Sequence, residues 1–215
     1  MRSVGLFVAA VASFMVAMPS LEAQRRTQRK PPPPPARKQE PAVVKCPESL
    51  GTGVKTKASF CFVLAGRDPA AGVIVNIPPH TGAATLTFDL HNRHTYSEEE
   101  VKGGRAFATY SAVIGVLTMT GDLLGRGAVQ SEFRRSRDLF DRISGGAGPG
   151  GVKAVAPIGR QDVTIPVPAK IDQVSLLGEI LNATTSAGRE VASPGRPVAI
   201  VSNVRIDYQP APVKR

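Results

Sequence analysis

The sequence of 215 residues contains no tryptophan, only two cysteines and 5% aromatic residues. Two cysteines are too few for a disulfide-dense small scaffold or for a four-cysteine zinc or iron–sulfur site. Glycine and proline are abundant, at 21 and 19 residues, but they lack the period of a collagen. The length therefore suits one large globular domain or two small ones.

The uncharged N-terminal run, residues 4–18, is shorter than the roughly 20 apolar residues that a membrane-spanning helix needs. The longest N-terminal candidate is residues 4–18, which follow Arg2 and carry no charge. We interpret residues 1–23 as a cleaved signal peptide. An uncleaved signal anchor is the alternative, because Arg25 and Arg26 follow at once. Export would place the mature chain, without a transmembrane span, in the periplasm or the extracellular space.

Residues 24–45 contain seven Lys and Arg but only one acid, Glu40, out of a net charge of +10 for the whole chain. Five consecutive prolines, Pro31 to Pro35, predict a stiff polyproline II segment of about 3.1 Å per residue. We therefore expect a disordered basic linker that spaces the folded domain and binds an anionic envelope polymer or an envelope protein. Nucleic acid is a poor candidate, because no aromatic residues lie among the cations. The residues expected to bind anions are Arg25, Arg26, Arg29, Lys30, Arg37 and Lys38.

The two cysteines, Cys46 and Cys61, enclose 14 residues at the start of the expected folded region. In an exported protein this even pair predicts one disulfide. A redox-active pair is the alternative, but the sequence has no CxxC motif. The spacing therefore favours a structural bond.

Most of the chain after Cys61 follows a strand pattern. In residues 83–91, Leu86, Phe88 and Leu90 alternate with Thr85, Thr87, Asp89 and His91, which is typical of a half-buried strand. Eight to ten such strands predict a single antiparallel β-sandwich, jelly-roll-like, over residues 46–210, with a short tail at 211–215. One or two short helices are expected at 97–103 and 136–144. The expected strands are 58–65, 72–77, 83–91, 105–119, 123–134, 152–156, 162–167, 171–181 and 197–208.

All three histidines, His80, His91 and His94, fall within 15 residues, and Asp89 lies among them. Two histidines and a carboxylate can hold zinc or another divalent metal, and histidine suits acid–base chemistry near neutral pH. No compact ligand motif such as HExxH is present. The structural interpretation, polar residues at strand ends and turns, therefore outweighs a metal or catalytic site.

Other motifs do not support an enzyme. Residues 146–151 match G-x-G-x-x-G, but a helix-like segment precedes them and a strand-like one follows, the reverse of a dinucleotide-binding unit. The G-x-S-x-G motif of hydrolases is missing. Sugar binding lacks the usual platform, since only three tyrosines are available for stacking.

Two hypotheses follow from these patterns. The first is an exported, non-catalytic β-sandwich module that is spaced by its basic arm, uses no cofactor and binds an envelope polymer or protein. The second is a small exported metal-binding protein or metalloenzyme that uses His80, His91, His94 and Asp89. Convergence of the imidazole rings would favour the second hypothesis, and scattered histidines would favour the first.

Overall fold

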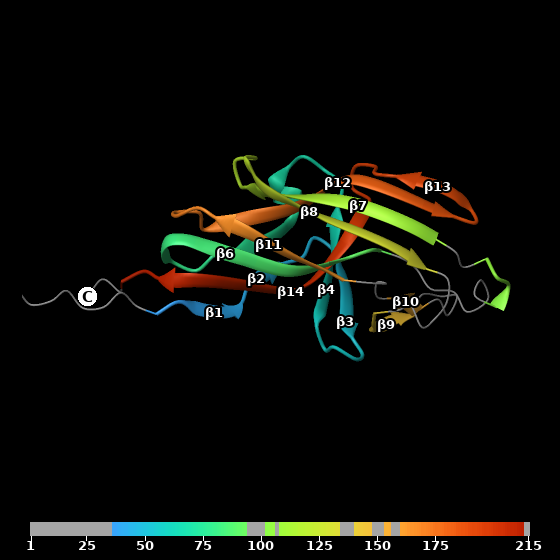
Figure 1. The fold of residues 1–215 in the computed structure, drawn as a ribbon, viewed down its shortest axis with the longest axis horizontal. Coiled ribbons are helices and arrows are strands. Elements are labelled where there is room, and N and C mark those ends of the chain that lie inside the picture. Colours follow the sequence, from blue (N-terminus) through green and yellow to red (C-terminus); the bar gives the residue numbers. More distant parts are fainter. Residues whose placement is uncertain are drawn as a thin grey trace, which may run out of the picture. The chain divides into compact units, whose positions relative to one another are not determined.

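Two antiparallel β-sheets make up the computed structural model of this chain (Figure 1). The structure describes residues 36–93, 102–105, 108–133, 140–147, 153–155 and 160–212, with backbone alone for 131–133, 144–147 and 153–155. The all-β fold that the sequence predicts is confirmed.

The strands of the described residues are β1 (Lys38–Pro41), β2 (Val43–Lys45), β3 (Ser49–Gly53), β4 (Ser59–Leu64), β5 (Val73–Asn76), β6 (His80–His91), β7 (Ala108–Thr118), β8 (Leu123–Phe133), β9 (Arg142–Ala147), β10 (Lys153–Val155), β11 (Gln161–Val167), β12 (Gln173–Thr185), β13 (Gly188–Val191) and β14 (Pro197–Pro210). One 3₁₀ turn, η1 (Pro69–Ala71), begins after Asp68, whose side chain accepts a hydrogen bond from the backbone of Ala70.

The strand order is that of a jelly roll. The larger sheet runs β10-β9-β3-β4-β14-β6-β11, with β1 also paired to β14; the smaller runs β2-β5-β12-β7-β8, with β13 also paired to β12. The eight main strands are numbered one to eight in chain order, as β4, β5, β6, β7, β8, β11, β12 and β14. Their order is then 1-8-3-6 in the larger sheet and 2-7-4-5 in the smaller. Two intertwined Greek keys produce this arrangement, so the fold is a jelly roll extended by short outer strands.

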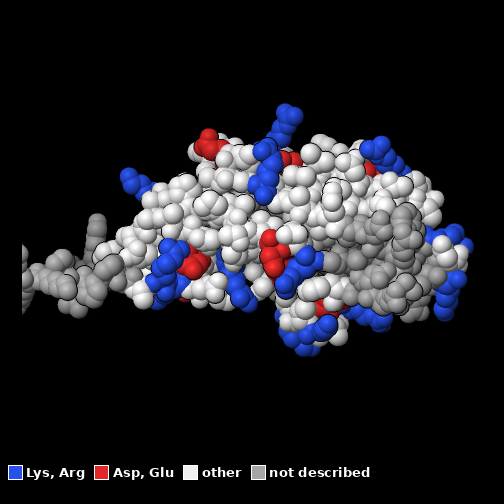
Figure 2. All heavy atoms as spheres, in the orientation of Figure 1, with Lys and Arg blue, Asp and Glu red and all other residues white. Residues whose placement is uncertain are grey.

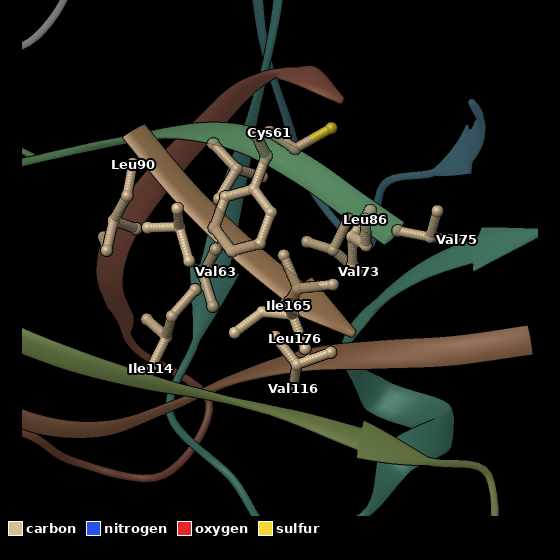
Figure 3. Packing of buried hydrophobic residues seen from close by; sticks show 14 of the residues in the cluster. Cys61, Val63, Val73, Val75, Leu86, Leu90, Ile114, Val116, Ile165 and Leu176 are labelled. Carbon is tan, nitrogen blue, oxygen red and sulfur yellow. The ribbon is translucent and has the colours of Figure 1, made fainter. Parts of the chain in front are cut away.

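The main core fills the space between the two sheets. Leu86 and Leu90 of β6 point across it toward Ile114 and Val116 of β7 (Figure 3). The alternation in β6 places Leu86, Phe88 and Leu90 in this core and Thr85 and Thr87 on the outer face, as the sequence predicts. Burying each such side chain stabilises the fold by roughly 1.5–3 kcal/mol.

A second, smaller apolar cluster covers one end of the outer face of the larger sheet. Phe60, Ile143 and Ile200 are its buried members, and Phe140 packs against it. Because Cys61 and Val63 face the main core, the phenylalanines of β4 point to the opposite side. Strand β4 is therefore buried on both faces.

Glycines let the two sheets approach one another at the β8–β11 edge. A Cβ atom at Gly125 would lie 2.8 Å from Ile165 Cδ1, and one at Gly127 would lie 3.0 Å from Val163 Cγ2. Only glycine allows β11 so near.

The opposite edge is closed by the N-terminal strap, residues 37–46. Its strand β1 pairs with β14 of the larger sheet, and β2 pairs with β5 of the smaller one. The predicted linker 24–45 is therefore wrong for residues 38–45, and the sandwich begins before Cys46. Backbone hydrogen bonds hold this segment although most of its side chains are exposed. Residues 1–35, with the predicted signal peptide, lie outside the described residues.

The helix predicted at 136–144 is wrong at its C-terminal end, because Arg142–Ala147 form β9, which pairs with β3 at Thr52 and Gly53. Pairing with a neighbouring strand outweighs the weak local helical spacing. Residues 134–139 lie outside the described residues. So do residues 94–101, which contain most of the helix predicted at 97–103.

Candidate binding site

His80 and His91, two of the three histidines of the predicted site, do not lie together. His80 and His91 are the first and last residues of β6, so about 36 Å of extended chain separates them. No single metal ion can bind both. His94 lies outside the described residues, and among those described no three His, Cys, Asp or Glu side chains group as a metal site requires.

Each described histidine has a structural role. His80 Nδ1 donates to the carbonyl oxygen of Pro78 at 2.9 Å, in the turn before β6. His91 is fully buried between Phe60 and Phe140, with ring centroids 5.5 and 5.1 Å away. Its Nε2 shares a hydrogen bond of 2.9 Å with Ser202 Oγ. A substrate has no access to this pair, which we interpret as a satisfied polar contact.

Asp89 belongs to a charged group on the outer face of the larger sheet. Arg160 Nε lies 3.7 Å from its Oδ1, and Asn203 Nδ2 donates to its Oδ2 at 3.4 Å. Asp162 is its cross-strand partner on β11. Burial and the hydrogen bond with Asp162 raise the pKa of Asp89, while the Arg160 guanidinium opposes the rise. The positive charge of Arg160 therefore already balances the carboxylates that a metal ion would need as ligands.

Cys46 and Cys61 form the predicted disulfide, with their Cα atoms 5.5 Å apart. The bond joins the end of the N-terminal strap to β4.

Of the cations assigned to the anion-binding arm, Arg37 is paired with Asp207, whose Oδ1 lies 2.6 Å from its Nε. Lys38 lies exposed on β1. Arg25, Arg26, Arg29 and Lys30 lie outside the described residues.

Charges on the described surface are mixed. On the face drawn in Figure 2, Lys and Arg side chains lie beside Asp and Glu side chains. Examples among the described residues are the pairs Arg126–Glu179 and Arg93–Glu190. Such exposed pairs add little stability, and they weaken any broad positive field from the sandwich.

An open groove on the outer face of the smaller sheet is the best candidate site. Its volume is about 560 Å³, and it crosses the four neighbouring strands β8, β7, β12 and β13. Tyr110 lies beneath it, with its side chain in the core and its hydroxyl donating to the carbonyl of Val198. This outer groove is lined by the side chains of Thr109, Ser111, Gln130, Asn182, Thr184 and Arg189.

Strand register arranges these side chains in two rows. Thr109, Thr184 and Arg189 are direct cross-strand neighbours. Gln130, Ser111 and Asn182 form the second row. Strands lie about 4.8 Å apart, so each row of three residues extends about 10 Å across the sheet.

Most of the polar side chains in the outer groove have no hydrogen-bond partner among the residues that the structure describes. Among the described residues, the only side-chain hydrogen bond within the groove runs from Arg189 Nη2 to Asn182 Oδ1, at 3.0 Å. The side chains of Thr109, Ser111, Gln130 and Thr184 are left to bind water or a ligand. Hydroxyl and amide groups both donate and accept hydrogen bonds, which suits a ligand rich in hydroxyl groups.

An apolar row borders these polar ones. Val113 of β7 is the cross-strand neighbour of Ile180 of β12 and of Ala128 of β8. Ile180 is 49% exposed, and Val191, beside Asn182 on β13, is 59% exposed. The face therefore offers hydrogen-bonding groups next to a narrow aliphatic surface.

Sequence reasoning missed the outer groove. Thr109 and Ser111 alternate with Tyr110 and Ala112, and Asn182 alternates with Leu181 and Ala183, as in any strand with one solvated face. The alternation could have identified each polar face. Only the register shows that the faces adjoin.

Comparison with protein-family models and with curated proteins gives no match. Among solved structures, the K1 cleaved adhesin domain of Lys-gingipain from Porphyromonas gingivalis W83 is similar with a TM-score of 0.34 and 8% identity, over 82% of this chain and 99% of that one. The arabinose-bound α-L-arabinofuranosidase MgGH51 is similar with a TM-score of 0.23 and 7% identity, over 78% of this chain and 26% of that one. Likenesses this low carry no functional argument. No described helix is long and apolar enough to cross a membrane.

Proposed function

We propose that this chain is an exported, non-catalytic binding module that holds a polysaccharide of the cell envelope or the extracellular space in its outer groove. The observation that carries the proposal is the set of hydroxyl and amide side chains that four strands bring together on one sheet face, most of them without a partner among the described residues. Such groups match a hydroxyl-rich chain along its length.

The placement of the titratable groups supports a non-catalytic role. Acid–base catalysis needs a group that can reach the substrate. His91 is fully buried. The negative charge of Asp89 is balanced by Arg160, and Asp89 lies on the larger sheet, whereas the outer groove lies on the smaller one. The metalloenzyme hypothesis therefore loses its main support, since His80 and His91 lie far apart.

Export and spacing complete the proposal. The Cys46–Cys61 disulfide suits an oxidising compartment, and the sequence of residues 1–23 has the pattern of a signal peptide. The spacer is now limited to residues 24–35, because strand β1 begins at Lys38. Four cations and five prolines in this segment would hold the module near an acidic surface.

The direct test is affinity electrophoresis of the mature chain against neutral and acidic polysaccharides. The groove variant carries Asn182→Ala and Thr184→Ala. Its matched control carries Thr85→Ala and Thr87→Ala, on the outer face of the larger sheet. We expect the groove variant to bind at least tenfold more weakly, and the control to bind as the wild type does. Failure of the wild type to bind any polysaccharide, or full binding by the groove variant, would overturn the proposal.

A further inference from the structure

We infer that the outer groove selects acidic polysaccharides, with the guanidinium of Arg189 binding a sugar carboxylate. This inference rests on the proposed function and names its substrate class. Among the described residues that line the groove, Arg189 is the only charged one. Among the described residues it forms no ion pair, whereas Arg126 and Arg93 each pair with a glutamate.

The position of Arg189 is fixed by its neighbours. It lies opposite Thr184 on the adjoining strand, and its Nη2 donates to Asn182 Oδ1 at 3.0 Å. This bond uses one of the five guanidinium donors. The remaining donors can bind a carboxylate, whose planar pair of oxygens matches the guanidinium in a bidentate contact. A lysine at this position would supply the positive charge but not the planar pair of donors that a bidentate contact needs.

The same bond fixes what Asn182 offers to a ligand. Since its Oδ1 already accepts from Arg189, its Nδ2 is the group left to donate to a ring hydroxyl. Thr184, beside Arg189, can donate and accept. A sugar with its carboxylate on Arg189 would therefore meet hydrogen-bonding groups on both sides.

The apolar row explains how a sugar could bind without stacking on an aromatic ring. Ile180 and Val191 expose aliphatic surface next to Asn182, and the C–H face of a sugar ring can pack against it. This surface is narrow, because the Arg126–Glu179 ion pair lies beyond it on the same face. A narrow strip between polar rows fits a single polysaccharide strand better than a broad protein partner.

The test compares polygalacturonate with its methyl ester, which has the same backbone without the negative charge. Binding is measured at about 0.15 M salt, where exposed charges beyond about 8 Å are screened. The variants of the full mature chain are Arg189→Gln, Arg189→Lys and Arg205→Gln. Arg205 is a matched control: its Nε donates to Asn203 Oδ1 at 3.1 Å, but it lies on β14 of the other sheet.

We expect the wild type to bind polygalacturonate at least tenfold more tightly than the ester. Arg189→Gln should remove that preference, while Arg189→Lys should restore only part of it. Arg205→Gln should keep the full preference. A wild type that binds both polymers equally overturns this inference alone. Equal losses in Arg189→Gln and Arg205→Gln do the same. A wild type that binds no polysaccharide overturns the proposed function as well.

Discussion

Ser202 and His91 are joined by a buried hydrogen bond of 2.9 Å between Oγ and Nε2. The exposed fractions of the two residues are 2% and 0%, so water cannot replace the bond. Two strands contribute the pair, since Ser202 lies on β14 and His91 at the end of β6. The contact therefore joins two neighbouring strands of the larger sheet beneath the second apolar cluster.

Replacement of Ser202 by alanine should lower the free energy of unfolding by about 1–3 kcal/mol, because the His91 ring would keep an unsatisfied buried nitrogen. Urea unfolding of the variant measures the loss. Thr87→Ala, at a half-exposed outer position, serves as control and should change stability by less than about 0.5 kcal/mol. Equal stability of the wild type and Ser202→Ala would show that the pair is not a structural contact.

The Asp141 carboxylate anchors the turn after β3, and it should make stability fall in acid. Burial by itself would raise its pKa, but hydrogen bonds from Thr56 and from the backbones of Lys55 and Arg142 prevail and lower it. A lowered folded-state pKa stabilises the protein above the unfolded-state value of about 4, and this contribution disappears as pH falls through the folded-state value.

We therefore expect Asp141→Asn to cost about 1–3 kcal/mol at neutral pH and to unfold with a weaker dependence on pH below about 4. Urea midpoints at pH 7 and pH 3 check both effects. Parallel acid dependence in the variant and the wild type would exclude Asp141 as the cause.

The N-terminal strap should contribute to stability although most of its side chains are exposed. Ala42 donates to the carbonyl of Val204 at 2.9 Å, and Tyr208 donates to Glu40 Oε1 at 2.9 Å. A chain that starts at residue 46 should be less stable than one that starts at residue 36 by at least about 1 kcal/mol, the net value of one hydrogen bond. Differential scanning calorimetry makes the comparison, and identical melting temperatures would contradict the strap's structural role.

Loss of the Cys46–Cys61 bond should destabilise the sandwich without changing its fold. The bond closes a loop with a sequence separation of 15, for which chain entropy predicts about 3 kcal/mol. The double variant Cys46→Ser/Cys61→Ser should keep its far-ultraviolet circular dichroism spectrum and unfold at lower urea concentration. Two titratable thiols per native wild-type chain would contradict the bond itself.

The main strands could be predicted from sequence because alternation is a local signal. Leu86, Phe88 and Leu90 show it clearly, and all three are buried. The N-terminal strap could not be predicted, since backbone pairing with β14 and β5 leaves no apolar pattern in residues 38–45. At β9, Phe140 and Ile143 fit a helical face as well as the second apolar cluster that they join.

The candidate site depended still more on long-range structure. His80, His91 and Asp89 are close in sequence, but an extended strand separates the two histidines and the cluster buries one of them. Thr109 and Thr184, 75 positions apart in the sequence, become neighbours only through the register of β7 and β12. Nearness in sequence was therefore a poor guide to the site.

Binding in the outer groove is the central claim, and nuclear magnetic resonance mapping of an acidic oligosaccharide on the full mature chain tests it most directly. We expect titration with trigalacturonate to shift the backbone amide signals of Thr109, Ser111, Asn182, Thr184 and Arg189, which share the groove. Thr85 and Thr87, on the outer face of the larger sheet, should not respond. Shifts confined to that sheet, or to the basic residues 25–30, would contradict the account.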